Sequence, residues 1–291
     1  MPGKPDISII GAGVVGTALG VLAAKAGYRV VAVAGRTIES ARKAAGMIAH
    51  AVACSPAEAA ARGNLVLLTV PDDAIASVAD RLAETGAVRA GAVVAHCSGA
   101  LGSDVLAVLA RRCGARVASM HPLQTFPTVP MAMNSIPGCY FFCEGDATAV
   151  SAVMQLAGDL GGIPMEIEAD RKTLYHAAAC MACNYLATLQ EAAIATAVLA
   201  GVGTLPARQA LAPLVAATAR NVMDLGPGAA LTGPIARGDK QTVARHLAAL
   251  DATSPSLAAL YRQLGRRTVD LACRAGKIDP PTAEELMRIL D

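Results

Sequence analysis

A glycine-rich segment near the amino terminus carries the sharpest chemical signal. It reads Gly-Ala-Gly-Val-Val-Gly, directly after the apolar run Ile7–Ile10 and before a helix-compatible stretch that ends at Gly27. In such a strand–turn–helix context the first Gly allows a tight turn, the second lets a pyrophosphate approach the backbone, and the third allows close helix–strand packing. The alternative is glycine for turn geometry alone. The context predicts a dinucleotide site, with the anion at the helix N-terminus, formed by Gly11, Ala12, Gly13, Val14, Val15 and Gly16.

The end of the next strand distinguishes NAD from NADP. An NAD site uses Asp or Glu there to bind the ribose 2′-hydroxyl, whereas this strand ends Ala34-Gly35-Arg36-Thr37. Arg36 offers a planar cation for a 2′-phosphate, and Thr37 offers a second donor. In the alternative reading, Arg36 is a solvated loop residue and Thr37 only a helix N-cap. NADP(H) is therefore the predicted cofactor, held in part by Gly35, Arg36 and Thr37.

Polar residues also follow the later strands, where ligands of doubly wound sheets bind. Val70, Pro71 and Asp72 follow the fourth expected strand, and Ser98 follows the fifth, so these residues are expected to flank the nicotinamide half of the cofactor. His121 follows the sixth, on a loop that is expected to be stiffened by three prolines. It is either a catalytic acid–base group or a structural histidine.

A long helical stretch after residue 168 holds the remaining candidates. His176 and Asn184 are separated by about 12 Å along a helix axis and offset by about 80°, so they could line one cleft without touching. Their polar groups need partners, which a substrate or neighbouring helices could supply. Lys172 lies one turn before His176. Cys180 and Cys183 form a CxxC without a second pair, and we expect core residues there and no metal site.

Short apolar runs alternate with Ala-rich helical stretches up to about residue 168. This alternation predicts an α/β fold with a doubly wound, mostly parallel Rossmann sheet, followed by an all-α domain. Asp72 and Asp146 are expected to cap helices that end at Gly86 and Gly161. The predicted domains are residues 1–168, which bind NADP, and residues 169–291, which bind substrate and dimerise. Eight strands are expected, near residues 6–10, 29–34, 47–51, 64–70, 92–97, 116–120, 139–143 and 163–166.

The second half is expected to be a helical bundle. Its first helix, residues 169–200, is apolar on nearly every face, which predicts burial among other helices and a homodimer. The charge-free stretch within it contains His176, Asn184 and Gln190, and this favours a bundle helix over a membrane span. Residues 226–239 are rich in Gly and Pro and are expected to form a shaped loop, a candidate lid. Further helices are expected near residues 206–224, 240–250, 254–275 and 282–290.

Composition narrows the possible partners. Hydrophobic residues make up 54% of the 291 residues, and 25 Lys and Arg nearly balance 23 Asp and Glu, so the chain is not disordered. A lack of basic stripes, with 3% aromatic residues and no Trp, argues against nucleic acid. The amino terminus does not resemble a signal peptide, which favours the cytoplasm and reduced thiols for the eight Cys. A small-molecule substrate remains, and local arginines could hold an anionic one.

Several motifs together resemble one family. They are Gly11–Gly16, Gly35-Arg36, Thr69–Asp72, His96–Gly99, His121–Phe126, Tyr175–Ala178 with Asn184, and Leu231–Asp239. The chain resembles Rossmann-like NADP-binding proteins that carry a C-terminal helical domain of unknown function. It is more distantly similar to 6-phosphogluconate dehydrogenase, β-hydroxyacid dehydrogenase, pyrroline-5-carboxylate reductase and ketopantoate reductase. The resemblance implies an oxidoreductase but names no substrate.

One departure from these relatives affects the chemistry. β-Hydroxyacid dehydrogenases and ketopantoate reductases place a lysine four residues before the helix asparagine, whereas Cys180 stands four residues before Asn184 here. The expected activity is hydride transfer between NADP(H) and a small carbonyl, imine or hydroxy acid. His176 or His121 would donate the proton, or Lys172 in their place, and Asn184 would orient the substrate. The rival hypothesis is a non-catalytic NADP(H)-binding sensor or partner-binding protein.

Overall fold

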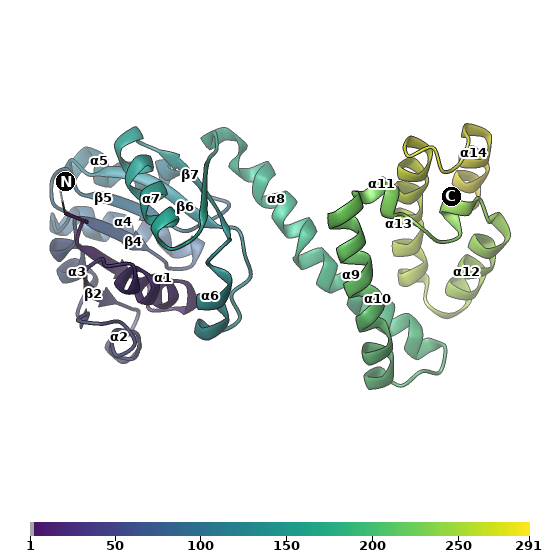
Figure 1. The fold of residues 1–291 in the computed structure, drawn as a ribbon, viewed down its shortest axis with the longest axis horizontal. Helices are drawn as coiled ribbons and strands as arrows, with labels where there is room; N and C mark the ends of the chain where they lie inside the picture. Colours follow the sequence, from purple (N-terminus) through teal and green to yellow (C-terminus); the bar gives the residue numbers. More distant parts are fainter. Residues whose placement is uncertain (1–2) are drawn as a thin grey trace. The chain divides into compact units, whose positions relative to one another are not determined.

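The computed structural model describes residues 3–291 and divides into two compact units (Figure 1). The first unit ends at Asn184, and the second is Tyr185–Asp291. The division falls after helix α8 (Lys172–Ala182), which therefore belongs to the first unit together with the sheet. The domain boundary expected between residues 168 and 169 remains a prediction.

The first unit is built on an eight-stranded sheet in the order β3-β2-β1-β4-β5-β6-β7-β8. Neighbouring strands are parallel except β6 and β7, which run antiparallel. The order reverses between β1 and β4, which is the switch point where ligands of this architecture bind. The predicted α/β Rossmann architecture is confirmed. The strands are β1 Ile7–Ile10, β2 Val30–Ala34, β3 Val52–Ala53, β4 Leu65–Leu68, β5 Val93–His96, β6 Arg116–Pro122, β7 Tyr140–Gly145 and β8 Ile163–Glu166.

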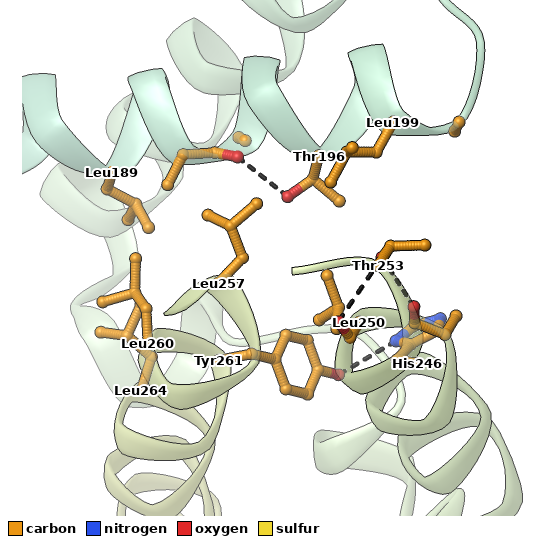
Figure 2. A pocket seen from close by; sticks show the side chains of 14 residues that line it. Leu189, Thr196, Leu199, His246, Leu250, Thr253, Leu257, Leu260, Tyr261 and Leu264 are labelled. Atoms are coloured by element: carbon orange, nitrogen blue, oxygen red, sulfur yellow. Dashed lines mark hydrogen bonds between the residues drawn. The ribbon is translucent and has the colours of Figure 1, made fainter. Parts of the chain in front are cut away.

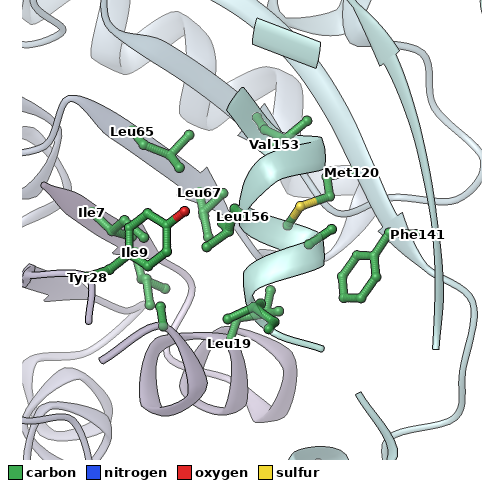
Figure 3. Close-up of a cluster of buried hydrophobic side chains, with 14 of the residues drawn as sticks. Ile7, Ile9, Leu19, Tyr28, Leu65, Leu67, Met120, Phe141, Val153 and Leu156 are labelled. Carbon is green, nitrogen blue, oxygen red and sulfur yellow. The ribbon is translucent and has the colours of Figure 1, made fainter. Parts of the chain in front are cut away.

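Side chains alternate between the two faces of the sheet along each strand. Helices cover both faces, so the strands contribute to two separate cores. Ile9 and Leu67 join one core with side chains of α1, α6 and α7 (Figure 3), whereas Ile10 and Leu68 join the opposite core with α3, α4 and α5. Burial on both faces explains why the strands are nearly all apolar. The helices are α1 Val14–Lys25, α2 Ile38–Ala45, α3 Pro56–Arg62, α4 Asp72–Thr85, α5 Ala107–Cys113, α6 Val129–Ser135 and α7 Ala147–Asp159, with short 3-10 helices at Ser103–Leu106 and Ala169–Arg171.

The second unit is all helical, as expected. Its core joins Val243 and Leu247 of α12 to Val269 of α13 and Leu286 of α14. Asp239 caps α12 by accepting a hydrogen bond from the Thr242 backbone N–H at 3.0 Å. Residues 226–239, expected to form a shaped loop without regular helix, contain the four-residue helix α11 and a 3-10 turn, with irregular backbone between them. The helices are α9 Asn184–Leu199, α10 Thr204–Leu225, α11 Pro227–Ala230, α12 Lys240–Thr253, α13 Pro255–Arg274 and α14 Pro280–Ile289, with a 3-10 turn at Ile235–Arg237.

The strand expected at residues 47–51 is wrong. The chain turns there instead, because the backbone N–H groups of Met47 and Ile48 continue the end of α2 by binding the carbonyls of Ala44 and Ala45. Ile48 is buried, so its apolar side chain fills the core from this turn. The edge strand β3 follows at Val52–Ala53 and pairs with β2.

The single buried helix expected at residues 169–200 is also wrong. A 3-10 turn occupies Ala169–Arg171, and Cys183 separates α8 from α9. Most of its apolar side chains are not enclosed by this chain: Leu174 is 70% and Met181 is 66% exposed. Cys183 is exposed rather than a core residue, and Cys180 is half-buried. No helix within residues 3–291 is long and apolar enough to cross a membrane.

Candidate functional site

The glycine-rich turn after β1 has the geometry that a dinucleotide site needs. Gly11 has a φ of +129°, and a Cβ there would lie 2.4 Å from the Thr69 carbonyl carbon. The Thr69 hydroxyl donates to the Gly11 carbonyl at 2.7 Å. At Gly16 a Cβ would lie 2.1 Å from the same carbonyl, so α1 packs directly against the turn. At Gly13 nothing lies within 4 Å of a Cβ position, and this open space fits the approach of a pyrophosphate.

The end of β2 presents the expected cation. Arg36 is exposed and lies two residues after the end of β2. Thr37 is the N-cap of α2, since its hydroxyl accepts a hydrogen bond from the Ser40 backbone N–H at 3.3 Å. Capping therefore accounts for Thr37 in the structure. Binding of a 2′-phosphate by Arg36 and Thr37 remains a prediction.

Ser98, after β5, is tied to the start of α4. Its hydroxyl donates to Asp72 Oδ2 at 2.7 Å and accepts from the backbone N–H groups of Ala100 and Leu101. Asp72 was expected to cap α4, but Pro71 holds the N-cap position and Asp72 lies in the first turn. Because α4 begins at Asp72, the Asp72 carboxylate lies in the first turn, where it accepts from Ser98 in the loop after β5. A hydrogen bond thus connects Asp72 and Ser98, two of the residues predicted to flank the nicotinamide.

His121 lies within β6 rather than on a loop. The antiparallel partner β7 extends the strand, pairing His121 with Phe142 and Pro122 with Phe141. The Nδ1 atom of His121 is 2.8 Å from the Tyr175 hydroxyl oxygen. Burial, reinforced by the positive charge of Lys172, lowers the pKa of His121 to about 4. The imidazole is therefore neutral near pH 7.

The structure brings His121 and His176 together. Their ring centroids are 5.9 Å apart and the rings meet edge to face. Both rings lie against Gly99: a Cβ there would be 2.5 Å from His176 Cδ2 and 2.8 Å from His121 Nε2. Any larger residue after Ser98 would displace them. Asn184 begins α9 beyond Cys183 and is exposed, and its predicted orienting role is not tested by this geometry.

A buried ion pair lies behind the two histidines. Lys172 is only 1% exposed, and its Nζ donates to the Ser98 carbonyl at 3.0 Å and to the Ser119 hydroxyl. The same Nζ lies 3.6 Å from Glu144 Oε1. Glu144 also accepts from the backbone N–H and hydroxyl of Ser103, at 2.8 and 2.7 Å. Burial lowers the pKa of Lys172, and the Glu144 carboxylate opposes that shift.

Sequence reasoning assigned no role to several residues of this network. Glu144 lies within β7 directly after the apolar run of residues 139–143, and a carboxylate at that position is the signal that could have found it. Tyr175 precedes His176 within the family-like motif, whereas nothing distinguishes Ser119 inside its strand. Among residues 3–291 no three or more His, Cys, Asp or Glu side chains are arranged to hold a metal ion.

Two known domain families match successive parts of the chain. Residues 2–122 match a Rossmann-like domain, and residues 139–268 match DUF2520, a domain of unknown function. The chain joins a Rossmann-like domain to a DUF2520 domain. The resemblance seen in the sequence is confirmed. The DUF2520 match begins just before β7, so Glu144, Lys172 and His176 come from it, whereas Ser98 and His121 come from the Rossmann-like match.

Solved structures share this architecture. A provisionally assigned NADP oxidoreductase from Bacteroides fragilis is 26% identical, with 91% of this chain and 98% of that chain covered and a TM-score of 0.73. A Thermotoga maritima protein is 25% identical over the same shares, with a TM-score of 0.74. The fold also matches a reductive aminase from Aspergillus terreus, solved with NADPH4, cyclohexanone and allyl amine, at 19% identity, with 98% of this chain and 99% of that chain covered and a TM-score of 0.63. No curated protein matches the sequence.

Proposed function

We propose that this DUF2520 protein is an NADP(H)-dependent oxidoreductase that transfers hydride between the nicotinamide and a small carbonyl, imine or hydroxy acid. One observation carries the proposal. The rings of His121 and His176 converge on Gly99, at the same carboxyl edge of the sheet as the open turn at Gly13. Ligands of doubly wound sheets bind along that edge.

The residues present fit a nicotinamide dinucleotide. Gly11–Gly16 would hold the pyrophosphate, because the backbone at Gly13 is open and the N-terminus of α1 favours an anion. Arg36 and Thr37 would bind the 2′-phosphate, with Gly35 completing the turn. Val70, Pro71, Asp72 and Ser98 would flank the nicotinamide half. When bound, the nicotinamide supplies or accepts the hydride.

The histidines would serve the substrate. Hydride arrival at a carbonyl creates negative charge on its oxygen; a positioned hydrogen-bond donor would stabilise that charge, and the oxygen would then take up a proton from solvent. His121 can donate a hydrogen bond from a neutral ring, and His176 is the second donor at the same glycine. Asn184 would orient the substrate. The buried Lys172 donates to the Ser98 carbonyl and so holds the loop that carries Gly99.

A substrate screen tests this activity. Purified protein is mixed with NADPH and a panel of keto acids and imines, and loss of absorbance by NADPH is followed, with the His121→Ala variant as control. Turnover of one class that disappears in the variant supports the proposal. Tight NADPH binding without turnover of any panel member would favour the rival function, a non-catalytic NADP(H) sensor.

A homodimer completes the proposal. Exposed leucine and methionine side chains gather on α10, where Leu214 is 62% and Met223 is 81% exposed. The neighbouring helix in the sequence, α9, has a single charged residue, Glu191, so an interface that includes α9 would bring few like charges together. Between α9, α12 and α13 lies a cavity of about 510 Å³ (Figure 2) whose lining is mostly leucine and alanine. Covering such surface with a second copy removes apolar area from water.

Light scattering at micromolar concentration tests the assembly, and twice the monomer mass is expected. Leu214→Glu should weaken the dimer because it places a charge on the proposed interface. Met131→Glu, at another exposed apolar side chain on α6, is the matched control and should leave the mass unchanged. A monomer at all concentrations would contradict the proposal.

A further inference from the structure

The contact between His121 and Tyr175 has a defined direction. The Nδ1 and Oη atoms are 2.8 Å apart, and the rings meet edge to face with centroids at 5.6 Å. Tyr175 is itself held by the Phe142 ring, 4.4 Å away. A phenol is a stronger acid than a neutral imidazole N–H, and an imidazole nitrogen is a better acceptor than a phenol oxygen. The hydrogen of this bond therefore belongs to Tyr175.

That direction determines the tautomer of His121. A neutral imidazole carries one N–H, so a ring whose Nδ1 accepts from Tyr175 carries its hydrogen on Nε2. Nε2 lies on the side of Gly99 and His176. We propose that Tyr175 is a positioning residue that fixes His121 as the neutral Nε2–H tautomer, a permanent hydrogen-bond donor beside Gly99. Its use in turnover rests on the proposed function, whereas the tautomer itself does not.

The surroundings keep the ring neutral. The titratable groups that face His121 are Lys172 and His176 on α8, His96 on β5 and Asp72 on α4. The ammonium group of Lys172 stays buried near His121, because it binds the Ser98 carbonyl, Ser119 and Glu144. Burial is the largest cause of the lowered pKa of His121, and the Lys172 charge adds to it, while Asp72 opposes both.

Tyr175 remains a donor across the same pH range. Burial raises the pKa of its hydroxyl, so the phenol keeps its hydrogen. A hydrogen bond from His121 Nε2 to an oxygen that gains negative charge requires no ionisation of either ring. Donors of this kind, aimed in advance at developing charge, are worth about 10²–10³ in kcat.

Nitrogen-15 NMR of histidine-labelled protein tests the tautomer directly, and the His121→Gln variant assigns the signal. In the wild type we expect a protonated Nε2 and an unprotonated Nδ1 at His121, unchanged from roughly pH 5.5 to pH 8. Tyr175→Phe should produce a mixture of both tautomers. Tyr261→Phe removes a similar Tyr–His contact elsewhere and is the matched control, which should leave His121 unchanged. A wild-type ring protonated at Nδ1, or an unchanged tautomer in Tyr175→Phe, would overturn the inference.

A double variant tests the effect of the Lys172 charge on His121. Lys172→Met combined with Glu144→Gln replaces the buried ion pair by neutral groups, and His121 should then titrate closer to the ordinary value of about 6.5. An unchanged titration would show that the Lys172 charge does not lower the pKa of His121. Once a substrate is known, Tyr175→Phe should lower kcat about tenfold with little change in NADPH affinity. If the tautomer is as expected but no substrate is turned over, the proposed function fails while the tautomer assignment stands.

Discussion

Two histidine–tyrosine pairs within residues 3–291 have nearly the same geometry. In the first unit, His121 Nδ1 lies 2.8 Å from the Tyr175 hydroxyl, with ring centroids at 5.6 Å. In the second, His246 Nδ1 lies 3.0 Å from the Tyr261 hydroxyl, with centroids at 5.9 Å. Both are edge-to-face contacts. Their chemistry differs because their surroundings differ.

The first pair is built from distant parts of the chain and lies beside a buried charge. His121 and Tyr175 are 54 residues apart, and the sheet brings them next to Lys172. The second pair is 15 residues apart, joins neighbouring helices α12 and α13, and leaves His246 exposed at the apolar cavity. A shared side-chain geometry is therefore not enough to indicate a site. Burial and the positive charge of Lys172 keep His121 of the first pair neutral.

The largest expected effect comes from removing that fixed charge. Lys172→Met would leave the Glu144 carboxylate buried without its cation, a change that typically costs about 3–5 kcal/mol of folding free energy. Urea unfolding measures the loss. The Lys172→Met/Glu144→Gln double variant should recover most of it, because no unpaired charge remains. Equal stabilities of the single variant and the wild type would show that the pair is not ionised.

Loss of the imidazole separates the two pairs by activity. His121→Ala should lower kcat at least about 10²-fold, because the donor at the reacting atom disappears, while NADPH affinity stays within roughly threefold. His176→Ala should show an effect of the same kind. His246→Ala, which alters the matched pair, should leave kcat near the wild-type value. A comparable loss of kcat in His246→Ala would contradict the assignment of the reaction to the site around His121.

Cofactor choice is the next test, and it lies outside both pairs. NADPH should bind at least about tenfold more tightly than NADH, equivalent to about 1.4 kcal/mol, because Arg36 stands where NAD sites carry a carboxylate. Arg36→Asp should remove most of this preference. Arg208→Asp, at an exposed arginine of α10, should keep it. Calorimetric titration that gives equal affinities for the wild type would contradict the assignment.

Local sequence signals predicted much of this fold. Apolar runs located seven of the eight strands, and the acidic cap Asp146 marked a helix start that the structure confirms. These features depend on near neighbours, so the sequence contains them directly. The interruption at Cys183 could not be predicted, because neither Gly nor Pro occurs there.

The surroundings of the candidate site depend on pairing across the sheet. His121 becomes a strand residue only because the antiparallel β7 extends β6 by pairing with it. Lys172 and Glu144 are 28 residues apart, and no helical or strand period relates them. The histidines themselves were recognisable by type and position. Their neutral state and their shared contact with Gly99 required the three-dimensional arrangement.

The pH dependence of stability gives the smallest difference between the pairs. The pKa of His121 falls to about 4 in the folded protein, below the value of about 6.5 in unfolded chains, so the unfolded state binds more protons between these pH values. Stability due to this ring is then complete above pH 6.5 and is lost as pH falls towards 4, with a slope of at most about 1.4 kcal/mol per pH unit. His96, whose pKa burial also lowers to about 4, should add a similar slope. Urea unfolding at several pH values should therefore show a shallower acid slope in His121→Gln than in the wild type. An unchanged slope in this variant would show that burial does not lower the pKa of His121 in the folded protein.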